Sequence, residues 1–163
     1  MPSATPSNQT GQAPTAAAGV LVILGASGDL TKRLLMPAIY NLACEGLLPD
    51  EFAVVGMALT DLTTAEFRAG QRQEIARFAT RKTFDEDRWQ WLESRLHYTP
   101  GNFADPVAYD RLMKLVLEVG QETGAAGNTL IYLAISPDFF AEVNQHLDAA
   151  GFTRMPGMKR IIV

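Results

Sequence analysis

The chain has 163 residues, of which 47% are hydrophobic, so it can bury one substantial core and should form one globular unit. Its formal net charge of −4 comes from interspersed charges, which leaves no basic face for nucleic acid or for an anionic membrane. Cys44 is the only cysteine, which excludes an intrachain disulfide and fits a cytoplasmic protein, and no apolar run approaches the roughly 18 to 20 residues that span a bilayer.

The first 18 residues are rich in Ser, Thr, Ala, Pro, Gln and Asn and carry no charged side chain. They therefore lack the basic segment with which a secretory signal peptide begins. A segment of this composition buries too little apolar area to order itself. We predict a disordered leader over residues 1–18 and a folded domain over residues 19–163.

Short apolar runs alternate with longer amphipathic segments from residue 20 onward, a pattern typical of a parallel sheet covered by helices. Residues 20–24 predict a buried first strand that ends at Gly25. Residues 30–45 predict a helix that Pro37 should kink, because proline lacks a backbone donor. The inner face of this helix is predicted to contain apolar residues at helical spacing, namely Leu34, Leu35, Ala38, Ile39 and Leu42.

The rest of the chain continues the alternation. Residues 52–55 predict a second strand ending at Gly56, and Thr63 with Glu66 resembles a capping box that opens the next helix. Three further helices are predicted, over residues 85–96, 106–122 and 137–150. Three further strands are predicted, a short one that begins at residue 96 and two over residues 129–134 and 160–163. The sequence thus predicts an α/β fold, a Rossmann-like doubly wound parallel sheet with helices on both faces. Because a buried parallel strand normally feeds a crossover, a strand at residues 160–163 suggests a piece of a longer protein.

Residues 25–32 read Gly-Ala-Ser-Gly-Asp-Leu-Thr-Lys and lie between the first predicted strand and helix. Two glycines let the backbone turn sharply and approach a ligand, while free amides and the helix dipole favour a pyrophosphate. The segment departs from G-x-G-x-x-G, since Ser27 and Leu30 stand at the second and third glycines. A P-loop is disfavoured because Leu30 and Thr31, not glycine, precede Lys32. We predict a pyrophosphate cradle, with a turn that binds nothing as the alternative.

Residues 25–32, followed by Pro-Ala-Ile-Tyr-Asn-Leu at 37–42 and Gly-Leu-Leu-Pro at 46–49, closely resemble the amino-terminal signature of glucose-6-phosphate dehydrogenases. The resemblance continues through residues 54–56, Thr63, 132–134, Pro137 and 160–163. It implies a parent protein that oxidises glucose 6-phosphate to 6-phosphoglucono-lactone in the pentose phosphate pathway, transfers a hydride to NAD(P) and forms a homo-oligomer. The family's catalytic histidine lies in an R-I-D-H motif that this sequence lacks, so we expect no catalytic residue, no metal site and no activity in this chain alone.

The resemblance also implies which residues line the cofactor site. The loop would hold the pyrophosphate, and the end of the strand predicted at 129–134 would line the cofactor cleft; for Phe140 the alternative is ordinary core packing. The residues concerned are Gly25, Ala26, Ser27, Gly28, Asp29, Leu30, Thr31, Lys32, Ala134, Ser136, Pro137 and Phe140.

Two departures from the family pattern concern specificity. Leu59 stands where G-x-A-R supplies an arginine to the 2′-phosphate of NADP, and Asp61 would repel a phosphate but accept a hydrogen bond from a free ribose hydroxyl. The cofactor is therefore NADP or NAD, and we expect NAD to be competitive unless a residue such as Arg33 reaches the phosphate. Leu34 stands where many relatives have a lysine facing the sugar phosphate, although it fits equally a core leucine with Lys32 or Arg33 substituting.

Two other functions remain open from the sequence. A non-catalytic nucleotide-sensing or scaffold protein would explain the changes at Leu34 and Leu59. A sugar dehydrogenase of another family could share only the glycine loop. His97 and His146, the only histidines, match no catalytic position of the resembled family.

Overall fold

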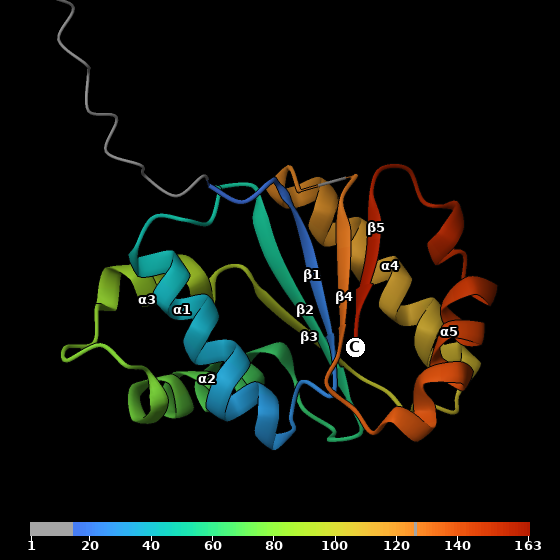
Figure 1. Cartoon of the computed structure of the whole chain (residues 1–163), viewed down its shortest axis with the longest axis horizontal. Helices are drawn as coiled ribbons and strands as arrows, with labels where there is room; N and C mark the ends of the chain where they lie inside the picture. Colours follow the sequence, from blue (N-terminus) through green and yellow to red (C-terminus); the bar gives the residue numbers. More distant parts are fainter. Residues whose placement is uncertain (1–14, 126) are drawn as a thin grey trace, which may run out of the picture.

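The computed structural model describes residues 15–125 and 127–163. Five parallel strands form one sheet in the order β3-β2-β1-β4-β5, so that β1 lies at its centre (Figure 1). This confirms the predicted α/β parallel sheet. The strands are β1 (Gly19–Leu24), β2 (Phe52–Ala58), β3 (Leu96–Pro100), β4 (Thr129–Leu133) and β5 (Lys159–Ile162).

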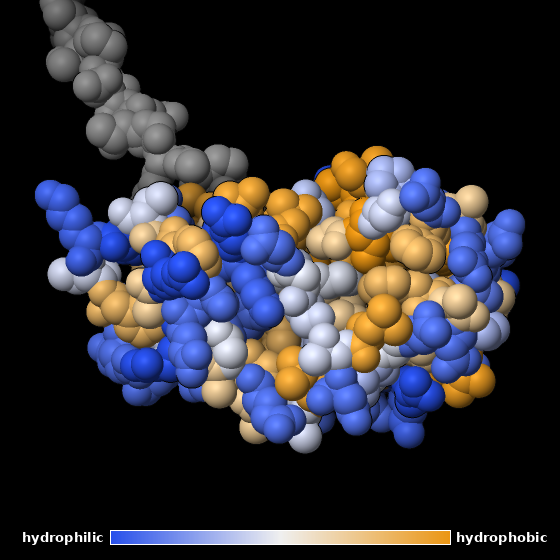
Figure 2. All heavy atoms as spheres, turned by 90° about the horizontal axis from the view of Figure 1, so that it is seen from below, coloured by the Kyte–Doolittle hydropathy of each residue, from blue (hydrophilic) through white to orange (hydrophobic). Residues whose placement is uncertain are grey.

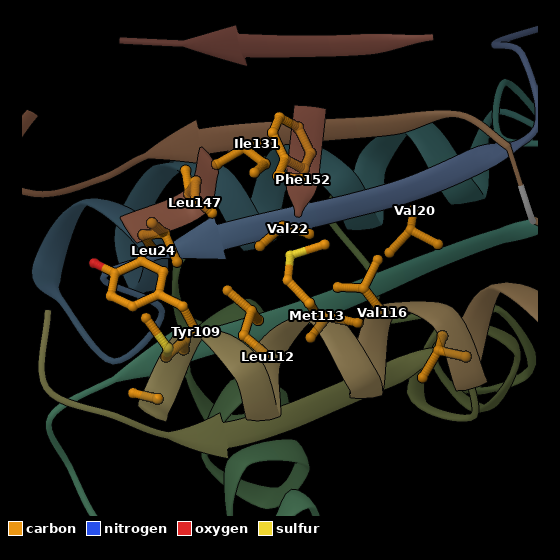
Figure 3. Packing of buried hydrophobic residues seen from close by; sticks show 14 of the residues in the cluster. Val20, Val22, Leu24, Tyr109, Leu112, Met113, Val116, Ile131, Leu147 and Phe152 are labelled. Carbon is orange, nitrogen blue, oxygen red and sulfur yellow. The ribbon is translucent and has the colours of Figure 1, made fainter. Parts of the chain in front are cut away.

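Helices cover both faces of the sheet (Figure 1). One face packs against α1 (Met36–Cys44), α2 (Thr64–Phe78) and α3 (Glu86–Glu93), and the other against α4 (Pro106–Thr123) and α5 (Phe140–Ala149). Alternate residues of β1 supply both cores: Val22 points toward α4 and Ile23 toward α1. Figure 3 shows the core on the α4 and α5 side, where Val22 packs near Leu112 and Val116 of α4.

The predicted leader falls largely on residues 1–14, which lie outside the described residues. Of the remainder, the Ala16 amide donates a hydrogen bond to the Leu47 carbonyl at 2.9 Å, and the Asn128 side chain donates to the Ala18 carbonyl at 2.9 Å. No helix in the described part of the chain is both long and apolar enough to cross a membrane.

The predicted inner face of the first helix is confirmed only in part: Ile39 is buried and Leu35 is partly buried against the same core. Leu34 is 63% exposed, and Ala38 and Leu42 are also exposed, whereas Met36 and Tyr40 are buried. The helix is apolar on two sides, and the side that packs against the sheet contains Met36, Ile39 and Tyr40. The interpretation of Leu34 as a core leucine is therefore wrong.

The irregularity expected at Pro37 takes the form of a wide turn. Residues Thr31–Leu35 form a π-helical turn, closed by a hydrogen bond from the Met36 amide to the Thr31 carbonyl. The turn ends at Leu35, and α1 begins at Met36 with Pro37 in its first turn, where a missing amide interrupts no hydrogen bond of the helix.

The second strand does not end at Gly56 as predicted, but continues to Ala58. A Cβ atom built on Gly56 would lie 2.6 Å from the Cβ of Ala26, so this glycine serves close packing inside the strand. The capping box of Thr63 and Glu66 is confirmed, and Asp85 caps α3, which is shorter than predicted. The helix expected from Pro137 begins as a 3-10 turn, Pro137–Phe139, before α5.

His97 of β3 gives the fold an expected pH dependence. Burial, then the charge of Arg68, lowers the pKa of His97 below its usual value of about 6.5, against an opposing effect of Glu122. Its Nε2 atom is buried without a hydrogen-bond partner among the described residues. Protonation is thus easier in the unfolded chain, so stability should be complete above pH about 6.5 and decline as the pH falls through that value.

We predict that this decline, measured as the urea midpoint between about pH 7.5 and 5.5, becomes shallower in His97→Thr. Threonine suits a strand and does not titrate. An unchanged pH dependence in the variant would show that the decline arises elsewhere.

Candidate functional site

The site predicted from the glycine loop lies at the carboxyl edge of the sheet. β1 leads to a helix on one face and its neighbour β4 leads to a helix on the other, so the connections after these two strands diverge. Ligands of open α/β sheets bind at this point of divergence. Figure 2 shows the molecule from this edge, where residues of intermediate hydropathy gather between charged and apolar side chains.

The loop after β1 is held by its neighbours on both sides. Gly25 has a left-handed φ of 92°, and its amide donates to the Met57 carbonyl of β2 at 2.8 Å. A Cβ atom on Gly25 would collide with the carbonyl of Ala134, which follows β4. The buried Thr31 hydroxyl donates to the Gly25 carbonyl at 3.1 Å. Gly25 is therefore required by the close approach of two neighbouring strands.

The next residues offer unpaired backbone donors. Across residues 15–125 and 127–163, the amides of Ser27, Asp29 and Leu30 have no hydrogen-bond partner. The Gly28 amide donates to the Gly25 carbonyl at 2.9 Å, which folds the loop over, and a Cβ atom on Gly28 would contact only that carbonyl oxygen, at 3.1 Å. A turn that opens a helix with free amides is suited to bind an anion such as a pyrophosphate.

The end of β2 lies beside this loop. The Ser27 and Thr60 hydroxyls are hydrogen-bonded at 2.9 Å, which brings the predicted specificity residues Leu59 and Asp61 to the same edge. Leu59 is 66% exposed and Asp61 is also exposed. Both side chains are thus available to a ligand bound at the loop.

The residues predicted after β4 have different environments. The Ala134 amide donates to the Leu24 carbonyl at 2.9 Å, while Ser136 and Pro137 are exposed, and Ser136 accepts a hydrogen bond from the Asp138 amide. Phe140 is half-buried and packs against the apolar core under α4 and α5.

Sequence reasoning missed two residues at this site. Thr60 bonds to the loop, and the Tyr98 phenol donates to the Thr60 carbonyl at 2.6 Å across 38 sequence positions. No local pattern signals such a contact. Within the described ranges, no group of three or more His, Cys, Asp or Glu side chains could hold a metal ion.

An apolar groove of about 370 Å³ lies elsewhere, at the amino-terminal edge of the sheet. Its lining includes Leu21, Ile39 and Leu130. It is separate from the glycine loop, at the other end of the strands.

A parallel sheet with this strand order and an anion-binding glycine loop after its central strand defines a dinucleotide-binding Rossmann domain. The chain belongs to the glucose-6-phosphate dehydrogenase family, because residues 22–163 match the family model described as "Glucose-6-phosphate dehydrogenase, NAD binding domain".

Relatives and solved structures agree with this assignment. The chain is 40% identical to a glucose-6-phosphate 1-dehydrogenase of Chlamydia muridarum over 79% of this chain and 25% of the relative, and 35% identical to glucose-6-phosphate 1-dehydrogenase 2 of Mycobacterium tuberculosis over 84% and 26%. A solved glucose-6-phosphate dehydrogenase in complex with its substrate glucose-6-phosphate superposes with a TM-score of 0.78 at 27% identity, over 93% of this chain and 31% of that chain.

The chain thus spans about a quarter of the length of the curated relatives it matches. These relatives and the solved structure all carry the name of one enzyme, so the comparisons do not favour a sensing protein or a dehydrogenase of another family.

Proposed function

We propose that this chain binds NAD or NADP as the dinucleotide-binding part of a protein that oxidises glucose 6-phosphate to 6-phosphoglucono-lactone. The observation that carries the proposal is the loop after β1, where the Ser27, Asp29 and Leu30 amides are unpaired within the described residues and Gly28 leaves the surface above it open. Both features fit a pyrophosphate, since its oxygens accept hydrogen bonds and need close approach to the backbone.

Bound NAD(P) would supply the hydride acceptor, and the residues of this chain would hold and orient it. The loop would bind the phosphates, the segment of residues 59–61 the adenosine ribose, and Ala134, Ser136 and Pro137 would line the path toward the nicotinamide. No residue of this chain is proposed to be catalytic: His97 lies in the edge strand β3, and the His146 ring packs against Tyr109, 5.0 Å between centroids.

The wider setting is also a proposal. The single cysteine supports a cytoplasmic protein, and the interspersed charges support one that binds neither nucleic acid nor membrane. The family resemblance supports a homo-oligomer and a dinucleotide-binding domain over residues 19–163, and composition supports the separate leader predicted over residues 1–18.

Replacing Gly28 with valine tests the loop. We expect Gly28→Val to lower the affinity for NAD and NADP at least about tenfold in titration calorimetry, because the side chain covers the free amides. The variant should remain folded, since Gly28 has no left-handed φ and its Cβ would meet only one atom, the Gly25 carbonyl oxygen at 3.1 Å, which a shift of a few tenths of an ångström relieves.

Gly70→Val in α2 is the matched control, because a Cβ there meets no atom within 4 Å, and it should leave the affinity unchanged. With glucose 6-phosphate added, neither the wild-type chain nor the variants should form reduced nicotinamide. Equal affinity in a folded Gly28→Val protein would contradict the assignment of this loop to the cofactor.

A further inference from the structure

The segment of residues 59–61 is fastened to both neighbouring strands. On the β1 side, the Gly25 and Ala26 amides donate to the Met57 carbonyl at 2.8 and 3.2 Å, and the Ser27 and Thr60 hydroxyls are hydrogen-bonded. Any nucleotide held by the loop would therefore meet this segment in a fixed position.

On the β3 side, the Tyr98 side chain holds the segment by hydrogen bonds. Its phenol donates to the Thr60 carbonyl at 2.6 Å, with the Ala58 carbonyl as a second acceptor at 3.2 Å, so the backbone on both sides of Leu59 is bound by one hydroxyl. The ring is 5% exposed and stacks on Phe67, with 4.9 Å between centroids. Burial, and then the negative charge of Asp61, raises the pKa of Tyr98, so the phenol remains a donor at neutral pH.

The backbone of Tyr98 in β3 also holds the chain just after the segment, at Thr64. The Tyr98 amide donates to the Thr64 hydroxyl at 3.1 Å, and that hydroxyl lies 3.3 Å from the Tyr98 carbonyl. Tyr98 thus binds the chain before and after Asp61, which limits where the Asp61 carboxylate can lie.

The charges around this segment do not suit a 2′-phosphate. Residues 56–67 contain no lysine or arginine. Arg68, the next basic residue, donates to the Leu96 carbonyl at 2.8 Å. The Arg33 guanidinium pairs with Asp29 at 3.4 Å and lies over the Phe78 ring, 5.4 Å from its centroid. Arg68 is therefore engaged away from the site and Arg33 is paired with a carboxylate of the loop, while Leu59 and Asp61 face solvent at the site.

We infer that Tyr98 is a positioning residue for the segment of residues 59–61, and that this segment selects a dinucleotide with a free ribose 2′-hydroxyl, NAD, over one with a 2′-phosphate. The inference rests on the proposed function. The Asp61 carboxylate accepts a hydrogen bond from the ribose and repels a phosphate, and Leu59 leaves the phosphate without a partner.

The test is titration calorimetry of this chain with NAD and with NADP, for the wild type and single variants. We expect the wild type to prefer NAD by about tenfold or more, Asp61→Asn to lose about tenfold in NAD affinity, and Leu59→Arg to gain about tenfold in NADP affinity. Tyr98→Phe keeps the buried ring but releases the segment, so it should reduce the NAD to NADP affinity ratio severalfold.

Tyr40→Phe is the matched control for Tyr98→Phe. Tyr40 is also a buried tyrosine stacked on a phenylalanine, Phe84, and its phenol is hydrogen-bonded to the backbone of Asp85. The Tyr40→Phe variant should change the thermal midpoint of unfolding without changing the NAD to NADP affinity ratio.

The outcomes separate the two proposals. A wild-type chain that binds NAD and NADP equally, or NADP better, overturns this inference but leaves nucleotide binding intact. A folded wild-type chain that binds neither overturns the proposed function and the inference with it. An unchanged ratio in Tyr98→Phe overturns the role of Tyr98 alone.

Discussion

Replacing Gly25 with alanine should abolish nucleotide binding and lower the free energy of unfolding by about 2 to 5 kcal/mol. The φ of 92° at Gly25 is costly for any side chain, and the new Cβ would also collide with the Ala134 carbonyl. The loop can relieve the collision only by moving away from β4, which would also disturb the hydrogen bond from the Gly25 amide to the Met57 carbonyl. Urea denaturation and nucleotide titration of the same sample measure both effects.

Gly46→Ala separates the two causes. Gly46 also has a left-handed φ, 68°, but a Cβ there meets no atom within 4 Å. Its replacement should cost only the conformational penalty, about 1 to 2 kcal/mol, and should leave nucleotide affinity unchanged. Equal losses of stability in the two variants would show that the contact with Ala134 is unimportant.

Gly56→Ala should lower the free energy of unfolding by about 1 to 3 kcal/mol and weaken nucleotide binding from the opposite side of the loop. Its Cβ would lie 2.6 Å from the Ala26 Cβ and 3.3 Å from the rings of Phe67 and Tyr98. Because Ala26 belongs to the glycine loop, a shift that relieves this contact also displaces the loop amides.

The partner in this contact can be removed. In the double variant with Ala26→Gly and Gly56→Ala, the methyl group has moved from the loop to β2, so part of the lost stability should return, with a coupling energy of about 1 kcal/mol. Additive losses across the four proteins of this cycle would mean that the rings of Phe67 and Tyr98, not Ala26, oppose the added methyl group.

The sequence predicted those elements whose causes are local. The capping box of Thr63 and Glu66 lies within four residues of chain, and β1, β2 and β4 are largely apolar runs, so both kinds of element are readable without tertiary contacts. The glycine loop was likewise found at the end of its strand, with Leu59 and Asp61 at the edge where the site was expected.

What could not be predicted depends on contacts between distant segments. The first helix carries apolar residues on two sides, and only its packing shows that Met36 and Tyr40, not Leu34, face the core. Gly56 was interpreted as the end of a strand, whereas it lies inside β2 and leaves space for Ala26. The link from Tyr98 to Thr60 spans 38 positions and has no sequence signature.

The position of β1 at the centre of the sheet affects how the chain can fold. β1 is the first strand in the sequence, but its neighbour β4 is the fourth, and the Asn128 side chain just before β4 binds the Ala18 carbonyl 110 positions earlier. Parallel neighbours need crossovers rather than hairpins, and such distant pairings form slowly. During synthesis β1 therefore keeps one unpaired, apolar edge until β4 emerges. This unpaired edge exposes the nascent chain to aggregation, and pairing with β4 covers it.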